Sequence, residues 1–254
     1  AVVKFDHVDF KYADGEENVL EDIDFEAKPG QTVAIIGSTG SGKSTLAKLI
    51  PRFFDVTNGK ITLDGVDIRD ISIETLRSQI GYVPQTGILF SGDINSNISY
   101  GAPGIDEAGI KEAAEIAQAT EFIEDKPDKY SSAIAQGGTN VSGGQKQRLS
   151  IARAIARNPK IYIFDDSFSA LDFKTDTQLR KALKPKTKDA TVFIVAQRVS
   201  TILHADQILV LDEGKLVGKG THKELVKNCE TYMQIAKSQL SEAEFAASIE
   251  GKED

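Results

Sequence analysis

A glycine-rich loop that follows an apolar run limits the possible folds of this chain more than any other segment. Residues 37–44 read GSTGSGKS and match the pattern G-x-x-x-x-G-K-[ST], and residues 32–36 before them, TVAII, predict a buried strand. Such a strand delivers the loop to a helix start, where backbone N–H groups and the helix dipole surround a phosphate. Lys43 adds charge for the β- and γ-phosphates, and Ser44 is a predicted Mg²⁺ ligand. We therefore expect an α/β fold with a nucleoside triphosphate site.

A second apolar run ends in a carboxylate. Residues 161–165 read IYIFD, which is typical of a buried parallel strand. Asp165 would then lie at the carboxyl end of the sheet beside the phosphate loop, where it can hold Mg²⁺. An Asp at this position could instead cap the next helix. The phosphate loop in the same chain favours the magnesium role.

A short Ser-Gly-Gly-Gln segment opens a predicted helix that extends to Ala156. Ser142 suits the N-cap position, and Gln145 at the third helical position completes a capping box. The two glycines between them would expose backbone donors in the first turn, which can form an anion site. A well-capped helix is the alternative, but a capping box does not require adjacent glycines. The pattern therefore favours a binding function.

Together these motifs resemble the nucleotide-binding domain of an ABC (ATP-binding cassette) transporter, and the resemblance covers nearly the whole chain. It implies an α/β ABC ATPase fold: a P-loop NTPase core with a parallel sheet, an N-terminal antiparallel β subdomain and an inserted α-helical subdomain. The implied division is 1–85 and 159–240 for the β subdomain and core, 86–158 for the helical subdomain, and 241–254 for a C-terminal tail. We expect the tail to be a solvated helix or partly disordered.

Apolar periodicity agrees with this division. Alternating residues predict antiparallel strands at 3–10 and 23–27, and apolar runs predict core strands at 80–85 and 190–195. Spacings of three and four predict helices at 105–117 and 142–156. After residue 207 we expect two short strands and two helices.

The resemblance implies which residues bind ATP and Mg²⁺. Tyr12 matches the aromatic residue on which adenine stacks, although it could be an ordinary hairpin tyrosine. Gln85 matches the Q-loop glutamine, whose amide oxygen can touch and release Mg²⁺, although it could be an exposed loop residue. The predicted ATP-binding residues are Tyr12, Gly37, Ser38, Thr39, Gly40, Ser41, Gly42, Lys43, Ser44, Thr45 and Gln85, and the predicted Mg²⁺ ligands are Ser44, Gln85 and Asp165.

Two further motifs imply a second cassette as partner. One matches the family's signature, which completes the site around the γ-phosphate of ATP bound to the other subunit, and the other matches the D-loop, which crosses the dimer interface. The signature residues are Val141, Ser142, Gly143, Gly144 and Gln145, and the D-loop residues are Ser169, Ala170, Leu171 and Asp172.

At two positions the chain departs from the pattern of an active enzyme. Asp166 stands where a glutamate normally polarises the attacking water, and Gln197 where a histidine normally contacts the γ-phosphate. Removing one methylene withdraws the carboxylate by about 1 Å, and such a misplacement costs on the order of a hundredfold in rate. Glutamine can donate a hydrogen bond but cannot carry a proton's charge. We expect ATP to be held and hydrolysed slowly, although Asp166 could still act as a slower base.

An intact signature beside an altered site resembles one half of a heterodimeric, multidrug-type ABC exporter. Residues 89–101 and 136–138 also resemble the exporter type, although Gln136 replaces the usual acidic residue. We expect a cassette at the cytoplasmic face of the cell membrane that powers efflux, with two partners: a different, hydrolysis-competent cassette and a fused or bound transmembrane domain. The alternatives are an active homodimeric ABC ATPase and a non-transport ABC protein, which would predict a second cassette, a coiled-coil insertion or a basic surface.

Composition fits these expectations. The 254 residues are 40% hydrophobic, without an apolar run near the ~20 residues of a membrane helix. A net charge of -8 argues against a nucleic-acid partner. The single cysteine, Cys229, fits a reducing cytoplasm, and we expect it to be solvated or half-buried near a helix start. Because the chain begins at Ala1 without Met or a signal peptide, we expect a domain of a longer polypeptide.

Overall fold

The computed structural model describes residues 1–250. They form two compact units, one made of Ala1–Arg77 together with residues from Thr191 onward, and the other of Ser78–Ala190. The first unit contains the phosphate loop, and the second contains Asp165 and the Ser-Gly-Gly-Gln segment.

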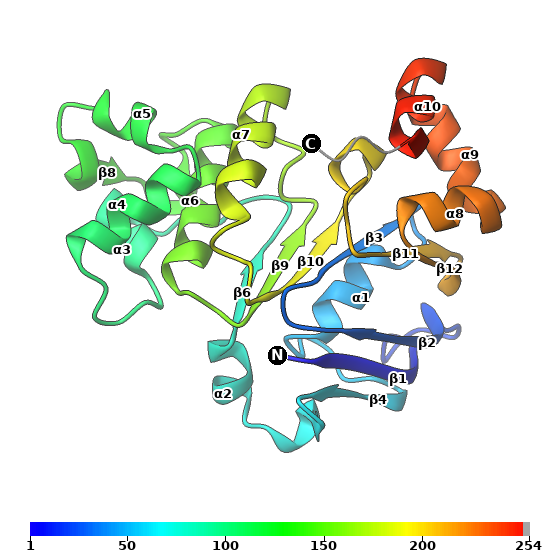
Figure 1. Cartoon of the computed structure of the whole chain (residues 1–254). Helices are drawn as coiled ribbons and strands as arrows, with labels where there is room; N and C mark the ends of the chain where they lie inside the picture. The colour runs from blue at the N-terminus through cyan, green and yellow to red at the C-terminus, as the bar shows by residue number, and fades with distance from the viewer. Residues whose placement is uncertain (251–254) are drawn as a thin grey trace. The chain divides into compact units, whose positions relative to one another are not determined.

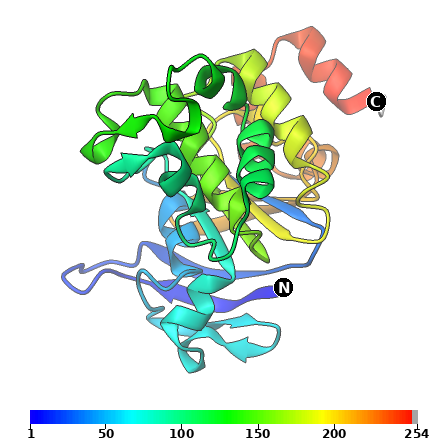
Figure 2. The same ribbon diagram turned by 90° about the vertical axis from the view of Figure 1, so that its left-hand side faces the viewer.

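An antiparallel layer opens the first unit. Strand β1 (Val3–Phe10) pairs antiparallel with β2 (Leu20–Ala27) and β4 (Asn58–Leu63), and β4 pairs with β5 (Val66–Asp67). The predicted alternation is confirmed, because apolar side chains of β1 and β2 point to one buried face, where the rings of Phe5 and Phe25 stack at 4.6 Å. The connection between β1 and β2 projects away from the strands (Figure 2).

A parallel layer continues the same sheet. The predicted buried strand is β3 (Thr32–Gly37), and parallel neighbours β10 (Thr191–Val195) and β11 (Gln207–Asp212) flank it (Figure 1). Strand β12 (Lys215–Gly220) runs antiparallel to β11 and joins β2. Helix α1 (Lys43–Leu49) follows the phosphate loop and buries Leu46 and Leu49. The strand–loop–helix order read from the sequence is therefore present.

Helices α8 (His222–Asn228), α9 (Glu230–Gln239) and α10 (Glu242–Glu250) end the described part of the first unit (Figure 1). The expectation for Cys229 was wrong: it lies at the predicted helix start but is buried, because its side chain packs beside Gly218 of β12. Most of α10 is exposed, as expected of a solvated helix, and residues 251–254 of the predicted tail lie outside the described residues.

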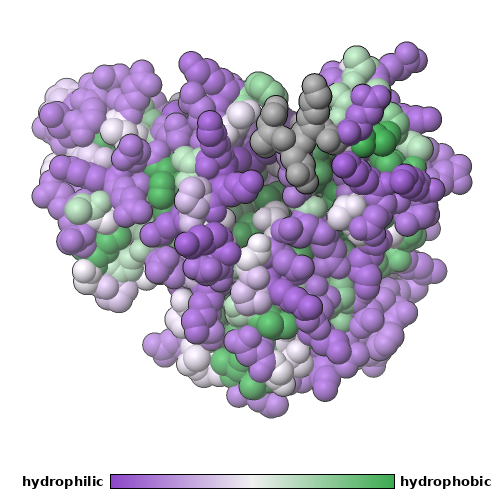
Figure 3. Space-filling model, viewed as in Figure 1, coloured by the Kyte–Doolittle hydropathy of each residue, from purple (hydrophilic) through white to green (hydrophobic). Residues whose placement is uncertain are grey.

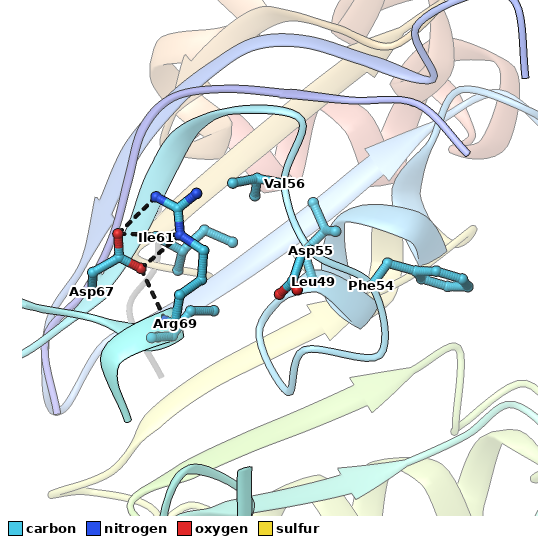
Figure 4. A pocket seen from close by; sticks show the side chains of 8 residues that line it. Leu49, Phe54, Asp55, Val56, Ile61, Asp67 and Arg69 are labelled. Atoms are coloured by element: carbon cyan, nitrogen blue, oxygen red, sulfur yellow. Dashed lines mark hydrogen bonds and ion pairs between the residues drawn. The ribbon is translucent and has the colours of Figure 1, made fainter. Parts of the chain in front are cut away.

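A small cavity lies beneath the β4–β5 hairpin (Figure 4). The short helix η1 (Ile68–Asp70) follows the hairpin, and an ion pair between Arg69 and Asp67, 2.7 Å apart, lies at the cavity. Apolar residues Leu49 and Ile61 line it as well. Its volume of about 10 Å³ is room for roughly one water, so it is a packing defect and not a ligand site.

In the second unit, strands β6 (Ile80–Val83) and β9 (Ile161–Asp165) pair in parallel. The two helices predicted there are α4 (Glu107–Ile116) and α6 (Gly143–Ala156), which pack together with α3 (Ile94–Ser99). The unit also holds α5 (Thr120–Glu124) and α7 (Phe173–Leu183), while α2 (Ile73–Ser78) leads into it.

The region that the sequence indicated to be helical also contains a small sheet. Strands β7 (Gly92–Asp93) and β8 (Ala133–Ile134) pair antiparallel within it. Each strand is too short to show an alternating pattern, and the pairing joins segments far apart in the sequence. The 3₁₀ turns η2 (Lys129–Ser131) and η3 (Gln136–Gly138) lie in the same region. A further 3₁₀ turn, η4 (Val199–Thr201), follows β10 in the first unit.

Over residues 1–250, no helix has the length and apolar character needed to cross a membrane. The face shown in Figure 3 is mainly hydrophilic, and apolar residues appear on it in small separate groups.

Candidate functional site

The phosphate loop is shaped by its glycines. A Cβ at Gly37 would lie 2.4 Å from the backbone oxygen of Leu211, so the close passage of β11 requires glycine. Gly40 and Gly42 have φ values of 79° and 101°, in the region that glycine adopts at low cost. Lys43 begins α1, and its Nζ donates a hydrogen bond to the Gly37 carbonyl at 2.7 Å. The lysine side chain thus folds back along the loop.

A phosphate group fits this loop. The Ser41 hydroxyl is buried and has no hydrogen-bond partner within the described residues. A Cβ at Gly40 would meet nothing within 4 Å, which leaves open space beside the loop. An anion that accepts a hydrogen bond from Ser41 would satisfy its hydroxyl, and the Lys43 ammonium would be a charged donor beside it.

Tyr12, from the connection between β1 and β2, lies beside the first turn of α1. Its hydroxyl forms a 3.0 Å hydrogen bond with the hydroxyl of Thr45, which connects two predicted site residues. Its ring meets Phe10 and Phe54 edge-on, with centroids 4.9 and 5.1 Å away. The sequence analysis missed Phe54, which is 39% exposed; the pair of adjacent phenylalanines a few residues after α1 is the signal that could have revealed it.

Asp165 is the buried last residue of β9, only 5% exposed. The Tyr82 hydroxyl, from the adjacent strand β6, donates a hydrogen bond to its Oδ2 at 2.9 Å. Burial, followed by the negative charge of Asp165, raises the pKa of Tyr82 far above its ordinary value of 10. Tyr82 therefore remains a donor at physiological pH. It was not predicted, since a tyrosine in an apolar run gives no sign of its partner.

The next residue, Asp166, contacts the Q-loop position. Gln85 Nε2 donates to Asp166 Oδ2 at 3.2 Å. Asp166 directly follows β9, and Gln85 lies two residues after the end of the paired strand β6. Asp166 has a φ of 51°, a left-handed conformation that Asp tolerates better than most residues. The Ser169 hydroxyl donates to the Asp166 carbonyl at 3.0 Å. The second unit thus brings together three predicted residues from the Q-loop, the strand end and the D-loop.

The Ser-Gly-Gly-Gln segment forms the predicted capping box. The Ser142 hydroxyl accepts from the Gln145 N–H at 3.2 Å, and the Gln145 side chain accepts from the Ser142 N–H at 3.3 Å. Gly143 has open space for a Cβ, whereas a Cβ at Gly144 would meet the Ala170 carbonyl at an ordinary 3.6 Å. The signature and D-loop positions are therefore neighbours within this unit, although packing inside the chain does not require either glycine.

The D-loop leads into α7. Leu171 is buried and anchors the loop, while Asp172 caps α7 by accepting from the Thr175 N–H at 2.8 Å. Hydrogen bonds from the Thr175 backbone and hydroxyl lower the pKa of Asp172. Phe173 follows and is 74% exposed.

Gln197 follows β10 in the first unit, and its side chain is exposed. A second glutamine, Gln239 of α9, contacts the backbone there: its Nε2 donates to the Gln197 carbonyl and its Oε1 accepts from the Val199 N–H, both at 2.7 Å. Gln239 was not predicted, because it is separated by some forty residues and belongs to no motif.

The predicted residues thus form two sets. Tyr12, the phosphate loop, Thr45 and Gln197 belong to the first unit, and the Q-loop, Asp165, Asp166, signature and D-loop positions belong to the second. The predicted Mg²⁺ ligands are a hydroxyl, an amide and a carboxylate, all oxygen donors of the kind that Mg²⁺ takes. The chemistry of the donor set therefore fits the ion.

These features together define a nucleotide-binding ATPase domain. They are a strand, phosphate loop and helix in that order, a parallel strand that ends in an acid, and a capped Gly-Gly helix start. The family model described as "ABC transporter" matches residues 20–169, more than half of the chain. The chain belongs to the ABC transporter family. Its ABC ATPase fold, predicted from the motifs, is confirmed by this match and by a solved structure of a bacterial Atm1-family ABC exporter with ATP bound.

That structure is 38% identical in sequence, superposes with a TM-score of 0.91, and aligns with 95% of this chain and 42% of its own. Among curated proteins, an uncharacterized ABC transporter ATP-binding protein of Mycobacterium tuberculosis is 47% identical over 94% of this chain and 41% of its own length. A putative multidrug export ATP-binding/permease protein of Staphylococcus aureus is 46% identical over 92% and 40%. The chain spans about two fifths of the length of these relatives.

Proposed function

We propose that this chain is the ATP-binding cassette of an exporter and binds Mg-ATP at a degenerate, slowly hydrolysing site. In this proposal it supplies its signature to the competent site of a different cassette. One combination of features carries the proposal. Asp166 and Gln197 stand at the two altered positions, whereas the capping box at 142–145 is complete. The exporter assignment is supported by relatives whose names describe export.

ATP binding rests on the first unit. The loop N–H groups and Lys43 bind the phosphates, Ser41 adds a hydroxyl donor, and adenine stacks on Tyr12. The bond from Tyr12 to Thr45 fixes the tyrosine relative to α1. Mg²⁺, held by Ser44, Gln85 and Asp165, would neutralise charge on the β- and γ-phosphates. Tyr82 keeps the Asp165 carboxylate oriented for this role.

Slow hydrolysis follows from the length and surroundings of Asp166. A glutamate would carry its carboxylate about 1 Å farther toward the attacking water. The Asp166 carboxylate instead accepts a hydrogen bond from Gln85, which occupies one of its oxygens. Gln197 can hydrogen-bond the γ-phosphate but brings no positive charge to it.

The proposed partners follow from the motifs that serve another chain. A second, hydrolysis-competent cassette would receive the signature of α6, and a fused or bound transmembrane domain would carry the exported compound. The cassette pair would lie at the cytoplasmic face of the membrane. ATP binding would favour the closed pair by the difference in its affinity for the closed and open states, and hydrolysis at the competent site would reset it.

The test compares ATP binding and steady-state ATPase activity of four chains: wild type, Asp166→Glu, Gln197→His and the double variant. We expect all four to bind Mg-ATP and, at a concentration high enough to allow dimers, only the double variant to hydrolyse it appreciably, at a rate on the order of a hundredfold above wild type. A Lys43→Ala chain controls for binding outside the loop. Wild-type turnover equal to that of the double variant would support an active homodimeric ATPase instead.

A further inference from the structure

The loop after β10 is held by one side chain from the C-terminal helices. Gln239, the last residue of α9, donates to the Gln197 carbonyl and accepts from the Val199 N–H. Both bonds are 2.7 Å long, at the short end of the range for N–H···O bonds. A single amide thus fixes the backbone on both sides of Arg198.

This arrangement controls the backbone of Gln197 and leaves its side chain available. The Gln197 side chain is exposed, whereas Val199 is fully buried and anchors the following turn η4. With one end anchored by Val199 and the carbonyl held by Gln239, the backbone from which the Gln197 side chain projects has little freedom left.

The position of Gln239 is itself well determined. Helix α9 buries Tyr232 and Ala236, and the Tyr232 hydroxyl lies 2.6 Å from Nδ1 of His222 in α8. The other ring nitrogen of His222 lies 2.8 Å from the Ser248 hydroxyl of α10. Three helices therefore support the side chain that holds the loop.

We propose that Gln239 is a positioning residue for the nucleotide site: it holds the backbone at Gln197 so that the Gln197 side chain is preorganised to contact the γ-phosphate of ATP. This inference rests on the proposed function, because it requires that Gln197 contacts the γ-phosphate. It adds a role for the C-terminal helices, which would set how well the site distinguishes ATP from ADP.

The expected effect is selective for the γ-phosphate. ADP lacks the group that Gln197 would contact, so loss of the Gln239 bonds should leave ADP affinity unchanged. ATP affinity should fall by roughly three- to tenfold, the range expected when one hydrogen bond loses its preorganised geometry. A merely structural role would weaken both nucleotides or only lower the melting temperature.

The experiment measures ATP and ADP affinities, each with Mg²⁺, for the 254-residue chain and its Gln239→Ala and Gln239→Glu variants. Glutamate keeps the acceptor for Val199 but loses the donor to the Gln197 carbonyl, so it should also lower the ATP-to-ADP affinity ratio. Gln234→Ala, an exposed glutamine of the same helix, is the matched control and should leave the ratio unchanged. Circular dichroism confirms that each variant is folded.

Two further variants separate this inference from the proposed function. Gln197→Ala should lower the ratio, and adding Gln239→Ala to it should cause no further loss, because Gln239 acts through Gln197. If Gln197→Ala does not change the ratio, the role proposed for Gln197 fails. If Gln197→Ala lowers the ratio and folded Gln239 variants leave it at the wild-type value, the positioning role of Gln239 is overturned.

Discussion

At the scale of single residues, Tyr82 tests how Asp165 is held. Tyr82→Phe removes the hydroxyl that donates to Asp165 Oδ2 while keeping the ring in place. Hydrogen-bond partners of metal ligands typically change metal affinity by 10–100-fold, so we expect the Mg²⁺ concentration for half-maximal ATP binding to rise about tenfold. The measurement is a Mg²⁺ titration at fixed ATP. An unchanged midpoint would mean that Tyr82 has no part in holding the ion.

For Tyr162 of the neighbouring strand β9, we expect that removing the hydroxyl does no harm. Tyr162 is fully buried, and no hydrogen-bond partner of its hydroxyl is found in residues 1–250. Because an unsatisfied buried hydroxyl destabilises a fold, we expect Tyr162→Phe to keep or raise the free energy of unfolding, by up to about 1 kcal/mol. Urea unfolding measures it, and ATP binding should be unaffected. A loss of stability beyond about 1 kcal/mol would indicate that the hydroxyl is bonded, for example to a buried water.

At the scale of elements, a substitution in helix α6 tells whether its first turn is only a capping box or also a signature. Gly144→Ala meets only an ordinary contact with Ala170, and alanine favours helix over glycine by about 1 kcal/mol. We therefore expect the variant to be at least as stable as wild type in thermal unfolding. We also expect it to abolish stimulation of a competent partner's ATPase, since a methyl group would enter the space of the partner's γ-phosphate. Full stimulation by the variant would leave α6 as a capped helix only.

The α8–α10 helices predict a pH dependence of stability. Burial, with a smaller effect of nearby His204, lowers the pKa of His222 below its usual 6.5. The unfolded chain then binds more protons than the folded one below about pH 6.5, so this group reduces stability as pH falls toward its folded pKa. We expect the stability difference between wild type and His222→Gln to shrink from pH 7.5 to 5.5, by no more than about 1.4 kcal/mol per pH unit.

His7 serves as the control, because the bond to Asp22 raises its pKa. That contribution is present at low pH and is lost as pH rises through the folded pKa, so His7→Gln should show a trend of the opposite sign. Urea unfolding of both variants at several pH values gives the comparison. Parallel trends for the two variants would contradict the assignment to individual histidines.

Local sequence patterns specify single elements of this fold, whereas contacts between distant segments leave no such pattern. The strand before the phosphate loop, the strand ending at Asp165 and the Ser142 capping box follow from local patterns, and the structure contains them. Tyr82 and Gln239 act through partners far away in sequence, and no local pattern specifies such contacts. Cys229 was misjudged because its burial depends on packing against β12 and not on its own neighbours.

At the scale of the whole molecule, the assembly state can be predicted from which motifs would serve this chain's own ATP and which would serve a partner's. In the proposed assembly each ATP would need the phosphate loop of one cassette and the signature of another, so both proposed sites would form only on association. Bringing two free chains together costs an estimated 4–15 kcal/mol, and attachment to membrane domains would reduce this cost by raising the effective concentration into the mM range. The chain alone lacks that advantage.

We therefore expect the isolated chain to sediment as a monomer at micromolar concentration, both without nucleotide and with Mg-ATP. Phe173, exposed directly after the D-loop, is the side chain whose burial an interface would most gain from. If sedimentation velocity instead shows a dimer in Mg-ATP, Phe173→Ser tells whether the D-loop side forms it. A dimer that Phe173→Ser disrupts and that hydrolyses ATP would favour the homodimeric enzyme, because two copies of this chain would then suffice to build a working site.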